Sequence, residues 1–347
     1  MKIRQKDCVC EVPQHVAVLG DETTSAAAPR VESGPIAVLP ENHDDNTIGG
    51  SQVFRDAVIE AGGDLQPLGP DTRGLVWLSY TKSSELGEVL AANPHLTWVQ
   101  LPWAGVDAYA QVLSELSRPG LVFTSAKGSY AQPVAEHAFG MIFALLRLFP
   151  RRIRATSWDA EPKGISLFNK NVVIIGAGGI ARELIRQLEP FNTHITVVRR
   201  SAGQVPGAAS TVTTDRLHKV LPTADVVVVA AALTGETTHL IGAEELALMK
   251  PTAVLVNIAR GPLVDPDALV EALNAEKIYG AAMDVTQPEP LPDGHPLWTA
   301  KNVLITPHMA DTPDMTAPLL AERISRNVAA FIEGEQFTGV VDTEAGY

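Results

Sequence analysis

The sequence predicts an α/β protein built from parallel sheets, and three observations support this fold class. Apolar runs typical of strands alternate with amphipathic segments typical of helices along most of the 347 residues. The runs in the second half are nearly continuous in Val, Ile and Ala, as in strands covered by helices on both faces. Residues 172–185, VVIIGAGGIARELI, read as a strand that breaks at glycines into a helix. A chain of this length exceeds the usual size of one core, so we expect two domains.

Taken in order, the first 35 residues are expected to be an extension outside the fold. Residues 21–35 are small, polar and free of aromatic side chains, which is typical of a linker. Cys8 and Cys10 lie in this extension, but no second pair of ligands is near them, so we predict no metal site. The start of the chain also lacks the apolar core of a signal peptide.

The first domain is expected to begin at residue 36. Amphipathic segments predict helices between its strands, and this alternation predicts a parallel sheet. The predicted strands are 36–40, 74–79, 97–102 and 120–125, and the predicted helices are 51–61, 85–92 and 107–116.

A long apolar helix is predicted from Pro133 to Phe149, with the proline in its first turn. Because it is apolar nearly all round, two interpretations stay open: a core helix that joins the domains, or a subunit interface. A second series of strands follows it, and a final helix near 317–332 could cross back onto the first domain. The strands of this series are predicted at 171–176, 194–200, 224–231, 252–259, 278–285 and 302–307.

Composition and charge exclude several classes of partner. The chain is 46% hydrophobic and 19% charged, which is ordinary for a soluble globular protein. Its formal net charge of −13 opposes nucleic acid and anionic membranes, since both would repel it. The longest apolar stretch, 134–149, is too short and too charged to span a membrane. We therefore expect a cytoplasmic protein.

The glycine-containing turn predicts a dinucleotide site. Gly176 permits a tight turn, Gly178 lets the backbone approach a pyrophosphate at the helix N-terminus, and the third position needs only a small side chain such as Ala181. The acid usual about 20 residues later is replaced by the run 199–201, Arg-Arg-Ser. Guanidinium and hydroxyl donors suit a 2′-phosphate, so we predict NADP(H) in preference to NAD(H). The alternative is that both arginines are solvated charges at the end of a strand.

Arg260, Glu289 and His308 each follow a strand of the second series. Ligands of such sheets bind beyond the carboxyl ends of the strands. An arginine fork can bind a carboxylate and polarise a keto oxygen, and a histidine can give that oxygen a proton. A carboxylate beside the imidazole favours its charged, donating form. The set suits hydride transfer to a 2-keto acid. The alternatives are structural: an ion pair, a turn between prolines and a strand-end histidine.

Several motifs resemble those of the D-isomer-specific 2-hydroxyacid dehydrogenases, continuously from about residue 131 to 311. LPWAGVD at 101–107 matches the substrate-side loop of that family more loosely, and AALT stands where PLT is common, so Ala232 could leave its loop less rigid. The stronger motifs are GAGGIA at 176–181, the long run 234–273, AMDVTQPEPLP at 282–292, HPLW at 295–298 and ITPHMA at 305–310.

The resemblance implies two Rossmann-like domains. A flavodoxin-like substrate domain (36–130 and 311–347) would carry an inserted dinucleotide-binding domain (131–310), with a hinge at the chain crossings near 130–133 and 310–313. The family is usually dimeric through the inserted domain, which favours the interface interpretation of the apolar helix.

The resemblance also implies roles for individual residues. Arg260, Glu289 and His308 would be catalytic, and Asp284 would hold the nicotinamide carboxamide. Amides of Ala104, Gly105 and Val106, together with Arg260, would bind the substrate carboxylate. The predicted cofactor-binding residues are Gly176, Gly178, Gly179, Ile180, Arg199, Arg200, Ser201, Leu233, Thr234, Ala259 and Asp284.

We therefore expect an NAD(P)-dependent oxidoreductase that interconverts a small 2-keto acid and the D-2-hydroxy acid. The LPWAGVD loop resembles that of glyoxylate/hydroxypyruvate reductases, and we expect NADPH as the preferred cofactor and a homodimer. Glu289 argues against formate oxidation, because relatives with that activity carry glutamine there. Two alternatives remain: an enzyme like the shorter D-3-phosphoglycerate dehydrogenases, and a non-enzymatic dinucleotide sensor like the corepressors that resemble this family.

Overall fold

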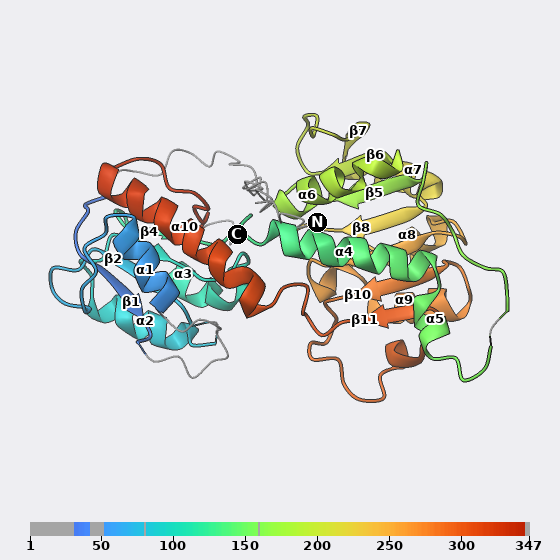
Figure 1. The fold of residues 1–347 in the computed structure, drawn as a ribbon, viewed down its shortest axis with the longest axis horizontal. Helices are drawn as coiled ribbons and strands as arrows, with labels where there is room; N and C mark the ends of the chain where they lie inside the picture. Colours follow the sequence, from blue (N-terminus) through green and yellow to red (C-terminus); the bar gives the residue numbers. More distant parts are fainter. Residues whose placement is uncertain (1–30, 42–51, 80, 159, 344–347) are drawn as a thin grey trace, which may run out of the picture.

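Two parallel sheets form two lobes that are joined by the chain crossing between them (Figure 1). The structure is a computed structural model and describes residues 31–41, 52–79, 81–158 and 160–343. Cys8, Cys10 and most of the predicted N-terminal extension lie outside the described residues. The predicted α/β class with parallel sheets is confirmed.

The first lobe contains a four-stranded sheet of order β1-β2-β3-β4, in which every neighbouring pair is parallel. The four strands predicted for this part of the chain all form, and the helix predicted at 107–116 starts as a 3-10 turn. The strands are Ile36–Leu39, Gly74–Trp77, Trp98–Gln100 and Val122–Thr124; the helices are α1 (Gln52–Glu60), α2 (Ser83–Ala92), the 3-10 turn Asp107–Tyr109 and α3 (Ala110–Leu116).

Helix α10 (Pro313–Glu333) returns to this lobe and packs against α1 (Figure 1). It begins four residues before the predicted start because the ring of Pro313 suits the first turn of a helix. Arg323 on α10 is fully buried and donates hydrogen bonds of 2.9 Å to the carbonyls of Ser125 and Lys127. Burial lowers the pKa of Arg323 to about 10. These bonds fix the helix to the chain that leaves β4.

The second lobe contains a seven-stranded parallel sheet of order β11-β10-β9-β8-β5-β6-β7. The chain builds outward from β5 in one direction and then returns to β8 to build in the other, so the glycine turn after β5 lies where the strand order reverses. The strands are β5 (Asn171–Ile175), β6 (His194–Arg199), β7 (Ser210–Thr213), β8 (Val226–Val229), β9 (Val254–Asn257), β10 (Gly280–Met283) and β11 (Val303–Ile305); the helices are α6 (Gly179–Leu188), α7 (Leu217–Val220), α8 (Ala243–Leu248) and α9 (Pro266–Asn274).

Burial on the second sheet explains which of its strands were predictable. All residues of β8, β9 and β10 are buried, which confirms the expectation from their continuous apolar runs. Strand β7 was missed. Three of its four residues, STVT, are polar, and all four are only partly buried at the edge of the sheet. No long apolar run marks such a strand.

Helix α4 (Ala131–Leu146) packs on α6 and against strands β9 and β10. It ends before the predicted Phe149 because Leu148 adopts a left-handed φ of 57°, and the short helix α5 (Phe149–Ile153) follows. The rings of Phe139 and Phe143 on α4 form an aromatic cluster with Phe191 and Phe168. No helix within the described ranges is long and apolar enough to cross a membrane.

Candidate active site

Three predicted residues lie beyond the carboxyl ends of neighbouring strands of the second sheet. Arg260 follows β9, Glu289 follows β10 and His308 follows β11, and these strands are adjacent in the sheet. His308 Nδ1 lies 2.6 Å from Glu289 Oε1, and both side chains are nearly half exposed. The imidazole and carboxylate predicted to form a pair therefore do so, and the pair is open to solvent on one side.

Asp284 holds the turn that carries His308. The backbone amide of His308 donates to the Asp284 carbonyl at 2.7 Å, and the amides of Met309 and Ala310 donate to the Asp284 carboxylate at 3.0 and 3.2 Å. His308 has a φ of 53°, a conformation that non-glycine residues rarely adopt. Several hydrogen bonds that one buried aspartate accepts therefore fix an otherwise unfavourable backbone.

A further network reaches Asp284 from helix α4. The Thr306 hydroxyl donates to Asp284 Oδ1, and His137 Nε2 lies 2.9 Å from the Thr306 hydroxyl oxygen and 3.5 Å from Asp284 Oδ1. Because the single hydroxyl proton of Thr306 goes to Asp284, His137 Nε2 is assigned as the donor to Thr306. Burial opposes ionisation of the Asp284 carboxyl, but hydrogen bonds from His137, Thr306 and the Met309 amide outweigh it and lower its pKa.

The turn bearing Arg260 is shaped by a buried asparagine and a glycine. Asn257 is fully buried, accepts a hydrogen bond from the Ala259 amide and donates one to the Arg260 carbonyl. A Cβ at Gly261 would lie 1.8 Å from the carbonyl oxygen of Thr286. Only a residue without a side chain permits this approach, which presses the Arg260 turn against the loop that carries Glu289.

The guanidinium of Arg260 contacts the first lobe. Its Nε and Nη2 donate to Asp107 Oδ2 at 3.2 and 2.9 Å, and its Nη1 donates to the Ala259 carbonyl at 2.7 Å. A Cβ at Gly105 would lie 1.9 Å from Nη2. The loop predicted to hold a substrate carboxylate, Ala104 to Val106, therefore lies against the predicted catalytic arginine.

The glycine turn after β5 has the features expected for a phosphate site. Gly176 has a φ of +117°, and a Cβ there would lie 2.3 Å from the Ala230 carbonyl oxygen. A Cβ at Gly178, the N-cap of α6, would meet no atom within 4 Å, so backbone approach from outside is open. Ala181 is fully buried, as the small third position of this turn requires. The residues present fit a pyrophosphate at the start of α6.

Other predicted cofactor residues lie on neighbouring strand ends. Arg199 ends β6, and its Nη2 donates to the Ser201 hydroxyl at 2.9 Å, while Arg200 is exposed. In the loop after β8, the Thr237 hydroxyl donates to the Ala232 carbonyl at 2.9 Å and accepts from the Thr234 amide at 2.7 Å. These hydrogen bonds constrain the loop in which alanine replaces proline. The remaining members of the predicted set are Gly179 and Ile180 in the first turn of α6, Leu233 in the loop after β8, and Ala259 before Arg260.

Four residues around the predicted set were not singled out from the sequence: Asp107, His137, Asn257 and Thr306. Asn257 carried a usable signal, because an asparagine within an apolar strand must find hydrogen-bond partners when it is buried. The other three lie on elements distant in the chain from their partners. For example, 153 positions separate Asp107 from Arg260.

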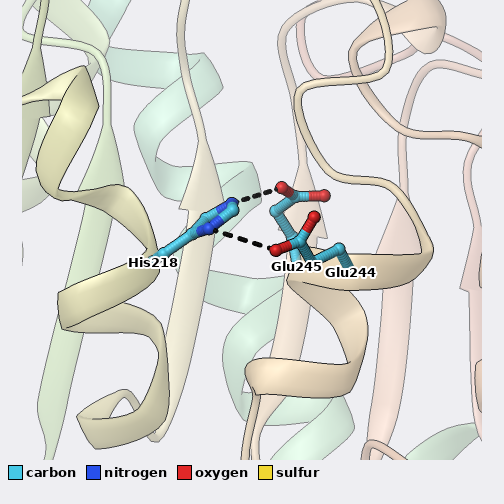
Figure 2. A group of neighbouring side chains, drawn as sticks. All are labelled: His218, Glu244 and Glu245. Atoms are coloured by element: carbon cyan, nitrogen blue, oxygen red, sulfur yellow. Dashed lines mark hydrogen bonds and ion pairs between the residues drawn. The ribbon is translucent and has the colours of Figure 1, made fainter.

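A separate cluster joins α7 to the start of α8 (Figure 2). Both helices lie away from these strand ends (Figure 1). His218 Nε2 lies 2.6 Å from Glu245 Oε1, and its Nδ1 lies 3.5 Å from Glu244 Oε1. Glu245 Oε2 also accepts from the Gly242 amide, which caps α8. The two nitrogens of the imidazole thus face different carboxylates. A metal ion would bind only one of these nitrogens. We interpret the cluster as an ion pair that joins the two helices.

Comparisons with known proteins identify the family to which the chain is similar. Residues 139–310 match the family model described as D-isomer specific 2-hydroxyacid dehydrogenase, NAD binding domain. The chain is 41% identical to an uncharacterised protein in the proB 3′ region of Corynebacterium melassecola, over 84% of this chain and 95% of that protein. It is 34% identical to a glyoxylate reductase of Thermofilum pendens, over 74% of this chain and 78% of the reductase.

A solved structure also has the same fold. The crystal structure of a D-isomer specific 2-hydroxyacid dehydrogenase from Xanthobacter autotrophicus Py2, in complex with NADPH and MES, superposes with a TM-score of 0.73. The two chains are 27% identical, and the match covers 91% of this chain and all of the other.

Proposed function

The chain belongs to the D-isomer-specific 2-hydroxyacid dehydrogenases, which are NAD(P)-dependent oxidoreductases, and we propose that it reduces a small 2-keto acid of the glyoxylate or hydroxypyruvate type. The observation that carries this proposal is the 2.6 Å pair of His308 and Glu289 at the same edge of the sheet as Arg260. The glyoxylate reductase activity named for the Thermofilum relative supports the substrate class.

Reduction adds a hydride to the keto carbon and a proton to its oxygen, so that C=O becomes CH–OH. A bound reduced nicotinamide supplies the hydride. His308 supplies the proton: its Nδ1 faces Glu289, so Nε2 is the nitrogen that delivers it. The Glu289 carboxylate stabilises the imidazolium before transfer and fixes the ring orientation.

Arg260 has two tasks in this proposal. Its planar fork binds the substrate carboxylate together with amides of the Ala104–Val106 loop, and its charge polarises the keto oxygen while negative charge develops there. The closeness of Gly105 to Arg260 Nη2 supports this shared binding, because it leaves the two groups of donors side by side.

We propose that NADPH is the preferred cofactor. The start of α6 receives the pyrophosphate, and Arg199, Arg200 and Ser201 receive the 2′-phosphate at the end of β6. Their position supports this assignment, since β6 is the strand next to β5 and its end carries two cations and a hydroxyl instead of an acid. The NADPH in the Xanthobacter structure is consistent with it.

We also propose that two copies of the chain pair through the surface around α4 and α5. Four large apolar side chains there are strongly exposed: Phe149 at 49%, Ile153 at 79%, Trp158 at 93% and Phe168 at 53%. All four lie within 20 positions of one another in the chain, and a surface rich in exposed apolar side chains favours an interface with another chain. A dimer would bury it at a distance from the strand ends that carry the proposed catalytic residues.

The proposed activity is tested by assaying a panel of 2-keto acids with NADPH and with NADH. Turnover of glyoxylate or hydroxypyruvate is expected, and His308→Ala should lower it by about 10²- to 10⁴-fold, the usual contribution of a positioned proton donor. His295→Ala is the control, because His295 caps the 3-10 turn at 296–299 and is not one of the predicted site residues. The absence of turnover with every keto acid, in the presence of measurable NADPH binding, would favour the dinucleotide sensor instead.

A further inference from the structure

We propose that Asp107 is a positioning residue for Arg260. The Asp107 carboxylate fixes the guanidinium so that the outer N–H groups of the guanidinium face the substrate. This inference rests on the proposed function, since the direction of these groups matters only when a keto acid binds to them. Asp107 is the first residue of the 3-10 turn that follows the Ala104–Val106 loop.

The hydrogen bonds of Arg260 define which edge of the guanidinium is used. An arginine has five N–H groups in a fixed plane. One from Nε and one from Nη2 point to Asp107 Oδ2, and one from Nη1 points to the Ala259 carbonyl. Each terminal nitrogen keeps one further N–H group, and these two groups are available to a carboxylate or to a carboxylate and keto oxygen pair.

The position of Gly105 indicates where these N–H groups lie. Arg260 Nη2 is so close to Gly105 that a Cβ at this position would be 1.9 Å away. Nη2, which also donates to Asp107, therefore lies against the Ala104–Val106 loop. A side chain at position 105 would displace the guanidinium, and Asp107, two residues later, holds it against the loop.

Each partner is fixed to a different sheet. The loop around Asp107 is anchored to the first lobe by buried Val106 and by Tyr109, whose hydroxyl donates to the Ser79 carbonyl at 2.6 Å. Arg260 is anchored to the second lobe through Asn257. The ion pair therefore forms only when the lobes are in the relation seen here, so the arginine is oriented at the same time as the two halves of the site are brought together.

Asp107 accepts from the Nε edge through a single oxygen, Oδ2, and so leaves one N–H group on each terminal nitrogen for a substrate. The pair is also partly exposed, with 57% of the Asp107 side chain accessible, so it adds little to folding stability. Removal of the carboxylate should therefore leave the protein folded.

The test compares Asp107→Ala, Asp107→Asn and the control Glu322→Ala in the NADPH-dependent reduction of glyoxylate and hydroxypyruvate. Glu322 forms an ion pair of the same 2.9 Å length with Arg326 on α10. Asp107→Ala should lower kcat/KM for the keto acid about 10- to 100-fold, because small misplacement of a binding group has effects of this size. Its KM for NADPH should stay unchanged. Asp107→Asn, which keeps an oxygen acceptor, should recover most of the loss.

A second measurement does not depend on turnover. Phenylglyoxal modifies accessible guanidinium groups, and peptide mapping gives the rate at each arginine. Arg260 should react with phenylglyoxal faster in Asp107→Ala than in the wild-type protein or in Glu322→Ala. Equal rates at Arg260 in all proteins, or an unchanged kcat/KM in Asp107→Ala, would overturn the positioning role. If the unmodified protein reduces no keto acid, the proposed function fails, and the modification rates still decide whether Asp107 holds Arg260.

Discussion

Thr306→Val tests the network that holds the turn of His308. Valine keeps the shape of threonine but removes the hydroxyl that donates to Asp284 Oδ1 and accepts from His137. A hydrogen bond to a charged group is worth about 1.5 to 3 kcal/mol. Two backbone amides still donate to the Asp284 carboxylate, so we expect a loss near the middle of that range, about 2 kcal/mol in the free energy of unfolding at neutral pH.

The pH dependence of this loss gives a sharper test than its size. The pKa of Asp284 is lowered in the folded protein, so its ionised form stabilises the fold above the ordinary carboxyl range, about pH 4. That stabilisation is lost as the pH falls through the lowered pKa. Thr306→Val lacks one of the hydrogen bonds that lower this pKa. As the pH falls, the variant therefore loses the stabilisation by ionised Asp284 at a higher pH than the wild-type protein does. The stability difference should therefore be largest at neutral pH and shrink below about pH 4.

The measurement is urea unfolding at several pH values, with Thr316→Val as the control. Thr316 is buried on α10, and its hydroxyl donates only to neutral carbonyls at the start of that helix, those of Thr312 at 3.1 Å and Pro313 at 3.5 Å. Its replacement should cost about 1 kcal/mol at every pH. A Thr306→Val loss that is as small as the control, or that does not change with pH, would refute the role given to Thr306.

Two further predictions concern the cofactor and the assembly. Arg199→Asp should raise the KM for NADPH far more than the KM for NADH, because it replaces a hydrogen-bond donor to the 2′-phosphate with a carboxylate that repels it. Steady-state kinetics with both cofactors measure this, and a wild-type preference for NADH would contradict it. The double change Ile153→Asp and Trp158→Asp should convert a dimer into monomers in analytical ultracentrifugation, because both side chains are strongly exposed in the single chain. Ile59→Asp, an equally apolar but separate exposed site on α1, should leave the dimer intact.

Most strands could be predicted from the sequence, because buried parallel strands have long apolar runs. β8, β9 and β10 are of this kind, whereas the edge strand β7 has polar residues and was missed. The end of α4 was also misplaced, since nothing in the local pattern marks the left-handed residue Leu148.

The candidate site was predictable where a residue directly follows a strand, because the carboxyl ends of parallel strands meet at one edge. Arg260 and His308 were predicted in this way, and both lie at that edge. Asp107 and His137 were not, since their roles depend on contacts made across the lobes and from a helix to a strand end. A single sequence gives the spacing of residues along the chain and leaves such contacts undetermined.

The contact between the glycine turn and the chain crossing has a kinetic consequence. A Cβ at Gly179 would lie 3.2 Å from both the Ala131 Cβ and the Gly128 Cα, so the first turn of α6 touches the segment that leads from the first lobe to the second. We therefore predict that a phosphate bound at that turn would order this segment before a keto acid binds. Cofactor occupancy would thus set the geometry that the acid meets, and the steady-state rates would follow an ordered sequence in which the nucleotide binds first and leaves last.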